Sequence, residues 1–308
     1  MKRKLAFLLI IILVPILAAS QGIVKREKKE TPKKEKTTTT KKTSTNSNSK
    51  GKQKSEFPNP KSTKVKEFTV GNVKYKIDNP SKSTVILVSY STQGAGQFKI
   101  PSIINYDGVN YKVTTIGDFA FWDCKQLSSV SIPNTITKIG MDAFNRCTGL
   151  TRVDISDLEA WCNIDFENSW SNPLMFAHNL YLNDELVTDL KLPATVKTIN
   201  KYAFAFCRSL TSIEIPPSVT SIGDNAFFDC TRLTSLIIPN SVTSIGEGTF
   251  QHCRGLTSVT IPPSVTSIGN FAFYYCTSLK SVSIPSRFKS RKDEIFKECP
   301  NLKDIKWI

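Results

Sequence analysis

The chain has 308 residues, 40% of them hydrophobic and 10% aromatic, and is long enough to bury a sizeable core. Its formal net charge of +15 is concentrated near the N-terminus: residues 21–66 hold 15 basic and four acidic side chains, whereas residues 67–308 hold 23 basic and 22 acidic ones. A nucleic-acid-binding domain needs positive charge on its folded surface, so this distribution argues against a DNA or RNA partner.

The first 20 residues have the three parts of a secretory signal peptide. Basic residues at 2–4 precede a run at 5–17 that is apolar apart from one proline, and small residues at 18–20 precede the expected cleavage before Gln21. The run is shorter than the roughly 20 residues of a membrane span. Because more basic residues follow the run than precede it, an uncleaved segment would instead favour a cytoplasmic body. We expect residues 1–20 to be a signal peptide and the protein to be secreted or cell-surface.

Residues 21–66 form a Lys/Thr/Ser-rich segment with almost no large apolar side chain, including the run KKEKTTTTKKTSTNSNSKGKQK. This composition cannot bury enough apolar surface to offset the loss of chain entropy, which predicts a disordered linker. The linker serves either as a solubilising spacer or as a basic contact to anionic lipids or polysaccharide, and its composition favours the spacer. Any membrane contact is expected only through this segment.

Residues 67–112 contain short segments in which apolar and polar side chains alternate. Two such segments flank Gly71 and Asn72, and residues 84–90 are rich in β-branched side chains. Both patterns predict the strands of β-hairpins. Because a stack of repeats exposes an apolar end, it needs an atypical terminal unit, and we expect residues 67–112 to form this N-terminal β cap.

A 23-residue repeat dominates the chain from residue 113 to residue 308. Its most regular column is cysteine, with a phenylalanine three residues before each cysteine and with Ile-Pro and Ile-Gly pairs at fixed offsets. The cysteines of this column are Cys124, Cys147, Cys207, Cys230, Cys253, Cys276 and Cys299. Several columns that keep one period indicate a stack of equivalent structural units.

The unit Leu256–Cys276, LTSVTIPPSVTSIGNFAFYYC, shows the physical role of each column. Its apolar strand residues are expected to point inward and the intervening Ser258 and Thr260 outward, which predicts one short strand per unit. The proline after the strand lacks an N–H and ends it, and the glycine permits a turn that a side chain would obstruct. Residues 270–276 are expected to form about two tight helical turns that bury the phenylalanine and the cysteine.

The repeated pattern, L-x-x-V-x-I-P-x-x-V-x-x-I-G-x-x-A-F-x-x-C, resembles the BspA-like type of leucine-rich repeat, which occurs in bacterial surface antigens and some protist surface proteins. The resemblance covers roughly residues 113–308, with seven regular units. It implies a repeat solenoid, an α/β horseshoe-like leucine-rich-repeat fold with short parallel strands on a concave face and short helical turns on a convex face.

One unit departs from the period, because Cys147 and Cys207 lie 60 residues apart, and we place an irregular insert at 154–190. The run NLYLNDELVTDL in this insert predicts a hairpin with Asn183 and Asp184 near its turn. The insert also carries several large or sulfur-containing side chains: Trp161, Cys162, Trp170, Met175 and Phe176. They form either a binding protrusion or a plug for the gap where the regular phenylalanine and cysteine are missing, and the behaviour of aromatic side chains favours the plug.

Few residues offer catalytic or metal-binding chemistry. His252 lies beside Cys253, but the repeat itself explains this cysteine, which weakens the case for a Cys–His catalytic pair. An enzyme site around His178 in the insert is a further alternative. The close Cys/His clusters that hold zinc and the Gly-rich loops that hold phosphate do not occur. The sequence therefore predicts a chain that is not an enzyme, with no metal site and no cofactor.

Eight cysteines in an exported chain ordinarily suggest disulfides. Seven of them occupy equivalent positions in stacked units, which places neighbours one sheet spacing, ~4.8 Å, apart. That separation is longer than the ~3.8 Å preferred between the Cβ atoms of a disulfide. We therefore expect buried free thiols that act as small apolar side chains.

The outward strand residues form two columns of small, mostly hydroxyl-bearing side chains. Such a face offers many weak hydrogen bonds to a protein or a glycan, although serine and threonine are also ordinary solvent-facing strand residues. The candidate ligand-binding residues on this concave face are Ser212, Glu214, Ser235, Ile237, Ser258, Thr260, Ser281 and Ser283.

The resemblance implies a secreted or cell-surface adhesion protein that binds an extracellular, host or matrix protein through its leucine-rich-repeat surface. A glycan is the other ligand considered for this surface. In the alternative function, the protein is a carbohydrate- or envelope-binding module that the basic linker at 21–66 assists. The fold alone implies only an extended binding surface, and no oligomeric state is predicted.

Overall fold

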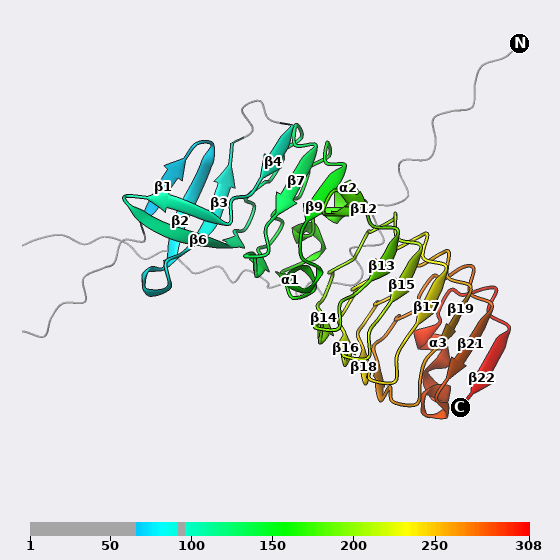
Figure 1. The fold of residues 1–308 in the computed structure, drawn as a ribbon. Helices are drawn as coiled ribbons and strands as arrows, with labels where there is room; N and C mark the ends of the chain where they lie inside the picture. The colour runs from blue at the N-terminus through cyan, green and yellow to red at the C-terminus, as the bar shows by residue number, and fades with distance from the viewer. Residues whose placement is uncertain (1–65, 92–95) are drawn as a thin grey trace, which may run out of the picture. The chain divides into compact units, whose positions relative to one another are not determined.

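The computed structural model describes residues 66–91 and 96–308 (Figure 1). These residues fall within one compact unit, Pro60–Ile308. The predicted signal peptide at 1–20 and, apart from Lys66, the predicted linker at 21–66 lie outside the described residues. Within the described ranges, no helix combines the length and the apolar character that crossing a membrane requires.

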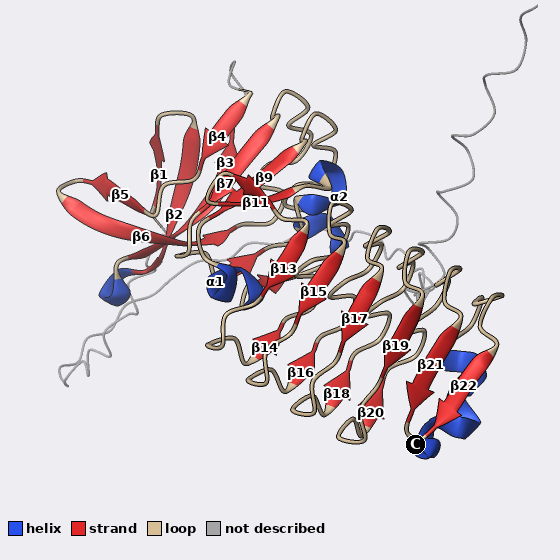
Figure 2. Ribbon diagram, turned by 45° about the vertical axis from the view of Figure 1, so that its right-hand side comes forward, coloured by secondary structure: helices blue, strands red, loops and turns tan. Residues whose placement is uncertain are grey.

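Each regular unit supplies two short strands, and equivalent strands of successive units pair in parallel to form two sheets (Figure 2). Paired residues are 23 positions apart, as in Ser212 with Ser235. After the insert, the longer-strand sheet contains β13 (Asp189–Lys191), β15 (Ser212–Glu214), β17 (Ser235–Ile237), β19 (Ser258–Thr260), β21 (Ser281–Ile284) and β22 (Asp304–Trp307). The shorter-strand sheet contains β14 (Thr198–Ile199), β16 (Ser221–Ile222), β18 (Ser244–Ile245) and β20 (Ser267–Ile268).

The same arrangement of two sheets precedes the insert. One sheet contains β4 (Gln97–Lys99), β7 (Ser129–Ile132), β9 (Arg152–Ile155), β11 (Leu180–Leu182) and β12 (Glu185–Leu186). The other includes β6 (Val109–Ile116), β8 (Lys138–Ile139) and β10 (Asp165–Phe166). Because β11 turns back as the antiparallel β12, the longer-strand sheet stops there and begins again at β13.

An antiparallel meander covers the N-terminal end of the units. It consists of β1 (Glu67–Val70), β2 (Val73–Asn79) and β3 (Thr84–Tyr90), with a single 3-10 turn, η2 (Pro80–Lys82), before β3. Strand β3 pairs in parallel with β6, and β5 (Ile103–Tyr106) forms a hairpin with β6. The alternating and β-branched segments of the sequence therefore form strands as predicted.

The inward side chains of the units form one continuous apolar core. In the strand of the unit Leu256–Cys276, Val259 and Ile261 are buried, whereas Ser258 and Thr260 are exposed. This pattern confirms the predicted alternation, since successive side chains of a strand point to opposite faces.

The phenylalanine column forms a stack of rings through the core. The ring of Phe227 is fully buried and lies nearly parallel to the rings of Phe204 and Phe250, with centroids 5.4 Å apart on each side. The stack continues through Phe273 to Phe296. Each interior ring of this stack therefore lies against equivalent rings in both neighbouring units, at Phe227, Phe250 and Phe273.

The cysteine column is a second connection between units. The eight cysteines are free thiols, as expected. In the regular units, the thiol donates a hydrogen bond to the carbonyl oxygen of the phenylalanine in the preceding unit, at 3.2 Å from Cys230 to Phe204 and 3.3 Å from Cys253 to Phe227. An apolar side chain of similar size lacks this weak donor, so cysteine both fills space and makes a hydrogen bond.

The turn region before each cysteine differs from the predicted helical turns. Phe271 and Tyr275 each have a left-handed φ of 58°, which interrupts a right-handed helical path. The N–H of Tyr274 donates to Phe271 within the unit at 2.9 Å, whereas the N–H of Phe273 donates to Ile295 of the next unit at 3.0 Å. A helix would keep both bonds internal, so the left-handed residues exchange helical bonds for bonds between units.

The glycine column marks a close approach between units. A Cβ atom on Gly269 would overlap the backbone of Glu247 in the preceding unit, and one on Gly246 would overlap the backbone of Asp224. The predicted need for glycine at this column is therefore steric.

The last unit replaces its short strand with helical structure. There, η4 (Ser286–Arg291) and α3 (Lys292–Ile295) follow β21. The guanidinium of Arg291 donates to the carbonyl oxygen of Ile268 in β20 at 2.5 Å, and that of Arg287 donates to Val265 at 3.4 Å. These side chains close the C-terminal edge of the shorter-strand sheet.

Burial determines the acidity of the thiols. It raises the pKa of Cys124 to about 11 and that of Cys147 to about 12. Cys299 differs, because it is only half-buried and a hydrogen bond with the Cys276 thiol lowers its pKa. The reactive thiolate form is therefore most populated at Cys299.

Alkylation of the folded protein at neutral pH should label Cys299 first, followed by mass spectrometry of the digested chain. Raising the pH toward the ordinary cysteine pKa should leave Cys124 and Cys147 slow, because their raised pKa values keep them protonated. In denaturant, all eight thiols should react with or without prior reduction. Thiols that are lost in pairs when reduction is omitted would contradict the free-thiol structure.

Truncating Phe227 to alanine should lower the free energy of unfolding by ~3–5 kcal/mol, because it removes a ring stacked on both sides and leaves a cavity. The control Ser235→Ala removes a solvent-facing hydroxyl in the next strand. This substitution should change the free energy of unfolding by less than ~0.5 kcal/mol. Denaturant unfolding of the full chain compares the two variants. Equal losses would show that the inward and outward faces are assigned wrongly.

Candidate functional site

The eight candidate residues lie on the outward side of the longer-strand sheet, which we call the Ser/Thr face. Five of them are exposed: Glu214, Ser235, Ile237, Ser258 and Thr260. The other three are half-buried: Ser212, Ser281 and Ser283. Each of β15, β17, β19 and β21 contributes two of them, on either side of a buried residue, so the register of the sheet aligns them in the two predicted columns.

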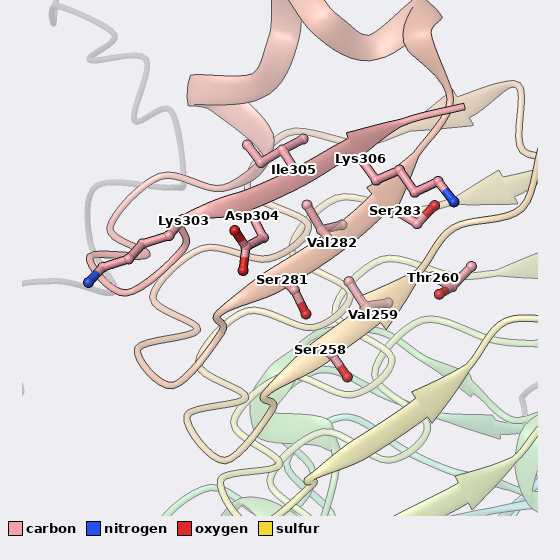
Figure 3. Close-up of a pocket in the computed structure, with 10 residues that line it drawn as sticks. All are labelled: Ser258, Val259, Thr260, Ser281, Val282, Ser283, Lys303, Asp304, Ile305 and Lys306. Carbon is pink, nitrogen blue, oxygen red and sulfur yellow. The ribbon is translucent and has the colours of Figure 1, made fainter.

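Four of the eight residues line one open depression of about 680 Å³ at the C-terminal end of this face (Figure 3). Ser258 and Thr260 come from β19, and Ser281 and Ser283 from β21. The remaining polar lining comes from β22 and the residue before it: Lys303, Asp304 and Lys306. The other four candidates, Ser212, Glu214, Ser235 and Ile237, lie farther along the face, outside the depression.

The charged end of the depression was not among the predicted site residues. In the register of β21 with β22, Asp304 pairs with Ser281 and Lys306 with Ser283, and Figure 3 shows these side chains next to one another. One column thus ends in a carboxylate and the other in an ammonium group. Both residues could have been found from their place in the repeat, since the two preceding units have Ser or Thr at the equivalent positions.

The hydroxyl groups of the face fall into two classes that the sequence does not distinguish. The flanking threonines bond to backbone, as in Thr211 to the Thr188 carbonyl at 3.0 Å and Thr234 to the Thr211 carbonyl at 3.1 Å. By contrast, the hydroxyls of the depression have no hydrogen-bond partner among residues 66–91 and 96–308: Ser258, Thr260, Ser281 and Ser283. The flanking threonines stabilise the stack, and the hydroxyls of the depression are available to a ligand.

At the other end of the face, the hydroxyl of Ser212 is already engaged. It donates to the carboxylate of Asp189 at 2.5 Å, and Thr188 donates to the same carboxylate at 3.0 Å. These bonds hold the pKa of Asp189 below its ordinary value. Ser212 therefore differs from the free hydroxyls of the depression, although both were predicted as equivalent.

Ile237 is an apolar exception among these columns. Its side chain is 76% exposed, and the register places it between Glu214 on β15 and Thr260 on β19. Glu214 is itself exposed, with its carboxylate 3.9 Å from the ammonium group of Lys191. The middle of the face therefore presents one apolar side chain beside an ion pair.

The insert fills the gap in the regular core. Its helix α1 (Leu158–Cys162) buries Trp161 and Cys162. The indole N–H of Trp161 donates to the Ala203 carbonyl at 2.8 Å, and its ring meets Phe166 edge to face. These residues fill the gap in the core, as the plug interpretation predicts, whereas three others are half-buried: Trp170, Met175 and Phe176.

The predicted hairpin of the insert is formed by β11 and β12, and both turn residues, Asn183 and Asp184, have positive φ. An ion-pair cluster that the sequence did not reveal holds this hairpin against β9. Arg152 donates to Asp154 and to Asp184, both at 2.7 Å, and its guanidinium lies 3.9 Å from the centroid of the Tyr181 ring. The cluster brings together residues up to 32 positions apart in the chain.

The middle of the insert includes η3 (Ser169–Ser171) and α2 (Leu174–Ala177), which lead to His178. Nε2 of His178 lies 3.3 Å from the guanidinium of Arg208, which is held by the Asp229 carboxylate at 2.8 Å. Burial and the charge of Arg208 lower the pKa of His178. The imidazole of His178 thus faces a guanidinium group that is already paired with a carboxylate. This arrangement fits a structural role for His178 better than a role in proton transfer.

The neighbouring His252 and Cys253 do not act as a pair. The thiol of Cys253 is buried and donates to Phe227, and burial raises its pKa. The ring of His252 packs among aromatic side chains of adjacent units, including Phe228 and Tyr274. Across the part of the chain that the structure describes, His, Cys, Asp and Glu side chains form no group of three that could hold a metal ion.

The sequence matches the profile of the "BspA type Leucine rich repeat region" in six copies, over residues 94–172 and 175–306. A comparison with curated proteins found no match.

Several solved structures are similar over most of this chain. A leucine rich cell surface protein from Faecalibacterium prausnitzii is 21% identical, with 79% of this chain and 94% of that chain covered and a TM-score of 0.36. A leucine-rich repeat protein from Bacteroides ovatus is 22% identical, with 78% and 76% covered and a TM-score of 0.35. The pneumococcal vaccine antigen PcpA is 15% identical, with 79% and 78% covered and a TM-score of 0.31. On the profile match, which covers most of its length, the chain belongs to the BspA-type leucine-rich repeat family.

Proposed function

We propose that this chain is an exported cell-surface protein that binds a protein ligand through the Ser/Thr face, and that it is not an enzyme. One observation carries the proposal: the hydroxyls that line the depression are free of hydrogen bonds to the described residues, whereas the flanking threonines are engaged. A surface made of free hydroxyls and ending in opposite charges is suited to binding. Family membership agrees, because stacked repeats provide extended binding surfaces.

The chemistry of the face suits a protein ligand. Free hydroxyls can donate to and accept from the backbone of a partner, and Asp304 and Lys306 can pair with charges at the rim. Ile237, exposed outside the depression, offers an apolar anchor that can enter a pocket of the partner. A glycan could use the hydroxyls alone, but it would leave the anchor without a complementary surface.

The thiols and histidines of the chain support the absence of catalysis. A catalytic cysteine needs an accessible thiolate with a base aimed at it, whereas the thiol of Cys253 donates to a backbone carbonyl inside the core. His178 lies against the paired cation of Arg208. Both groups are better explained by the stability of the stack.

Replacing Ser258 with arginine should abolish or weaken ligand binding by at least ~10-fold, equivalent to ~1.4 kcal/mol, by filling the depression. Ser267→Arg is the matched control, because Ser267 is an exposed strand serine of the same unit but lies on the shorter-strand sheet. Binding is measured for the full chain on a panel of matrix proteins beside a glycan array. We expect signal on proteins that Ser258→Arg loses and Ser267→Arg keeps.

Two results would contradict the proposal. Signal confined to glycans would favour the carbohydrate-binding alternative, and a version without residues 21–66 would then show whether the basic linker supplies affinity. Equal binding by the wild type and Ser258→Arg would place the ligand on another surface, such as the hairpin β11–β12.

Export is tested separately at the N-terminus, in the part of the chain outside the described residues. N-terminal sequencing of the native protein should find a mature chain that begins at or near Gln21, because small residues precede that position. Protease added to intact cells should then reach the body. An intact chain starting at Met1, with a body protected from external protease, would show the opposite orientation.

A further inference from the structure

The two sheets end differently at the C-terminal side of the stack. The shorter-strand sheet ends at β20, where Arg287 and Arg291 donate to backbone carbonyls of that unit. The longer-strand sheet continues two strands beyond the unit of β20, through β21 to β22, which pairs with β21 on one side and is the last strand of the sheet among the described residues. One sheet edge is therefore closed by side chains, and the other presents backbone.

The backbone of β22 shows which groups this edge presents. The N–H of Asp304 donates to Lys280 at 3.1 Å and the N–H of Ile308 donates to Ile284 at 3.0 Å, so the even-numbered residues face β21. Because successive peptide groups of a strand point to opposite sides, the N–H and C=O groups of Ile305 and Trp307 point to the open edge.

The inward side chains of β22 are also incompletely covered. Ile305 and Trp307 are half-buried, whereas their partners on β21, Val282 and Ile284, are buried. The final unit thus combines uncovered apolar side chains with free backbone donors and acceptors, the two features that lead strands to add to a sheet edge.

We propose that a second copy of this chain occupies the edge, with the two β22 strands antiparallel about a two-fold axis at Ile305. In an antiparallel pair, opposite residues that exchange both N–H···O bonds alternate with pairs that exchange none. Ile305 opposite Ile305 of the second copy is a hydrogen-bonded pair, as the outward direction of its peptide groups requires. The longer-strand sheets of two copies then join into one continuous sheet.

The charges of β22 select this register. With the axis at Ile305, Asp304 lies opposite Lys306 of the second copy, and the symmetry repeats the pair. This is a pair without mutual backbone bonds, in which the side chains approach closest, so both ion pairs form on the outward face. Centring the axis on Asp304 or on Lys306 would instead oppose like charges, which destabilises a cross-strand pair.

A second copy fits this edge better than an unrelated strand because the edge is complementary to itself. A carboxylate and an ammonium group two residues apart on one face match their own reversed order, and the interface closes with two-fold symmetry. Charged residues ordinarily protect an edge from uncontrolled pairing, and here they permit one register. The inference goes beyond the proposed ligand surface and does not depend on it. Because the dimer pairs Asp304 with Lys306, it competes with a ligand that pairs with either charge.

Sedimentation velocity of the full chain over a range of concentrations tests the pairing. We expect a reversible monomer–dimer equilibrium for the wild type. Asp304→Lys and Lys306→Asp should each weaken dimerisation by at least ~10-fold, because each places like charges opposite one another twice. An equimolar mixture of the two variants should form a heterodimer, since both opposed pairs are then complementary, and this recovery excludes misfolding as the cause of the single effects.

The double variant Asp304→Lys/Lys306→Asp should also dimerise, because it exchanges the two charges. Zero-length carbodiimide coupling of mixed light and isotope-labelled wild-type chains should join Asp304 of one copy to Lys306 of the other. Any of three results would overturn the inference. The wild type could stay monomeric, both single variants could dimerise as well as the wild type, or the edge could pair only with an unrelated extended peptide. Glu214→Lys, on β15 of the same face, is the control and should leave the dimer unchanged.

Discussion

In five units the carbonyl oxygen of the column phenylalanine accepts two hydrogen bonds, one from its own unit and one from the next unit, and the fold depends on this pairing: Phe121, Phe204, Phe227, Phe250 and Phe273. At Phe227, one comes from the backbone N–H of Cys230 in the same unit and the other from the thiol of Cys253 in the next, both at 3.3 Å. A single unit completes neither its hydrogen bonds nor the burial of its apolar face. Its stability therefore comes from contacts with the neighbouring units. The 23-residue period is the spacing that lets each thiol reach its carbonyl while the rings stack and the strands stay in register.

The insert shows what replaces these bonds when the period is broken. Cys207 has no column phenylalanine directly before it in the stack, and its sulfur lies 3.6 Å from the hydroxyl of Ser209 instead. At two other positions, side chains of the insert donate to backbone carbonyl oxygens: Trp161 to Ala203 at 2.8 Å and Asn172 to Tyr202 at 2.7 Å. Trp161 thus bonds to a carbonyl whose counterpart in a regular unit, that of Ala226, accepts from the N–H of Phe204 in the preceding unit.

The sequence predicted most of the fold because each column has one dominant requirement. Alternation around Ser258 and Thr260 identified the strand faces, and the spacing of the cysteines identified the stack. The turns were predicted less well, since the left-handed φ of Phe271 and Tyr275 follows from hydrogen bonds to the next unit rather than from local propensity.

The candidate site was predicted only as a face. Whether a hydroxyl bonds to the backbone or stays free depends on the geometry between units. The sequence alone therefore does not distinguish the engaged hydroxyl of Thr211 from the hydroxyls of the depression. The Arg152 cluster and the charged end of the depression depend on which strands the topology makes adjacent. Periodicity identifies equivalent positions, but it does not show how the ends and interruptions of the stack change them.

The steric match at the glycine column has a consequence for how the protein can change in length. The hexapeptide Ser-Val-Thr-Ser-Ile-Gly occurs three times, at 218–223, 241–246 and 264–269. Each copy meets its neighbour through the same backbone approach at the glycine. Gaining or losing one whole period between these copies leaves every junction unchanged, whereas a shift by a single residue would put a side chain where only hydrogen fits. The solenoid can therefore vary in discrete steps of one unit, and the Ser/Thr face lengthens or shortens by one strand at each step.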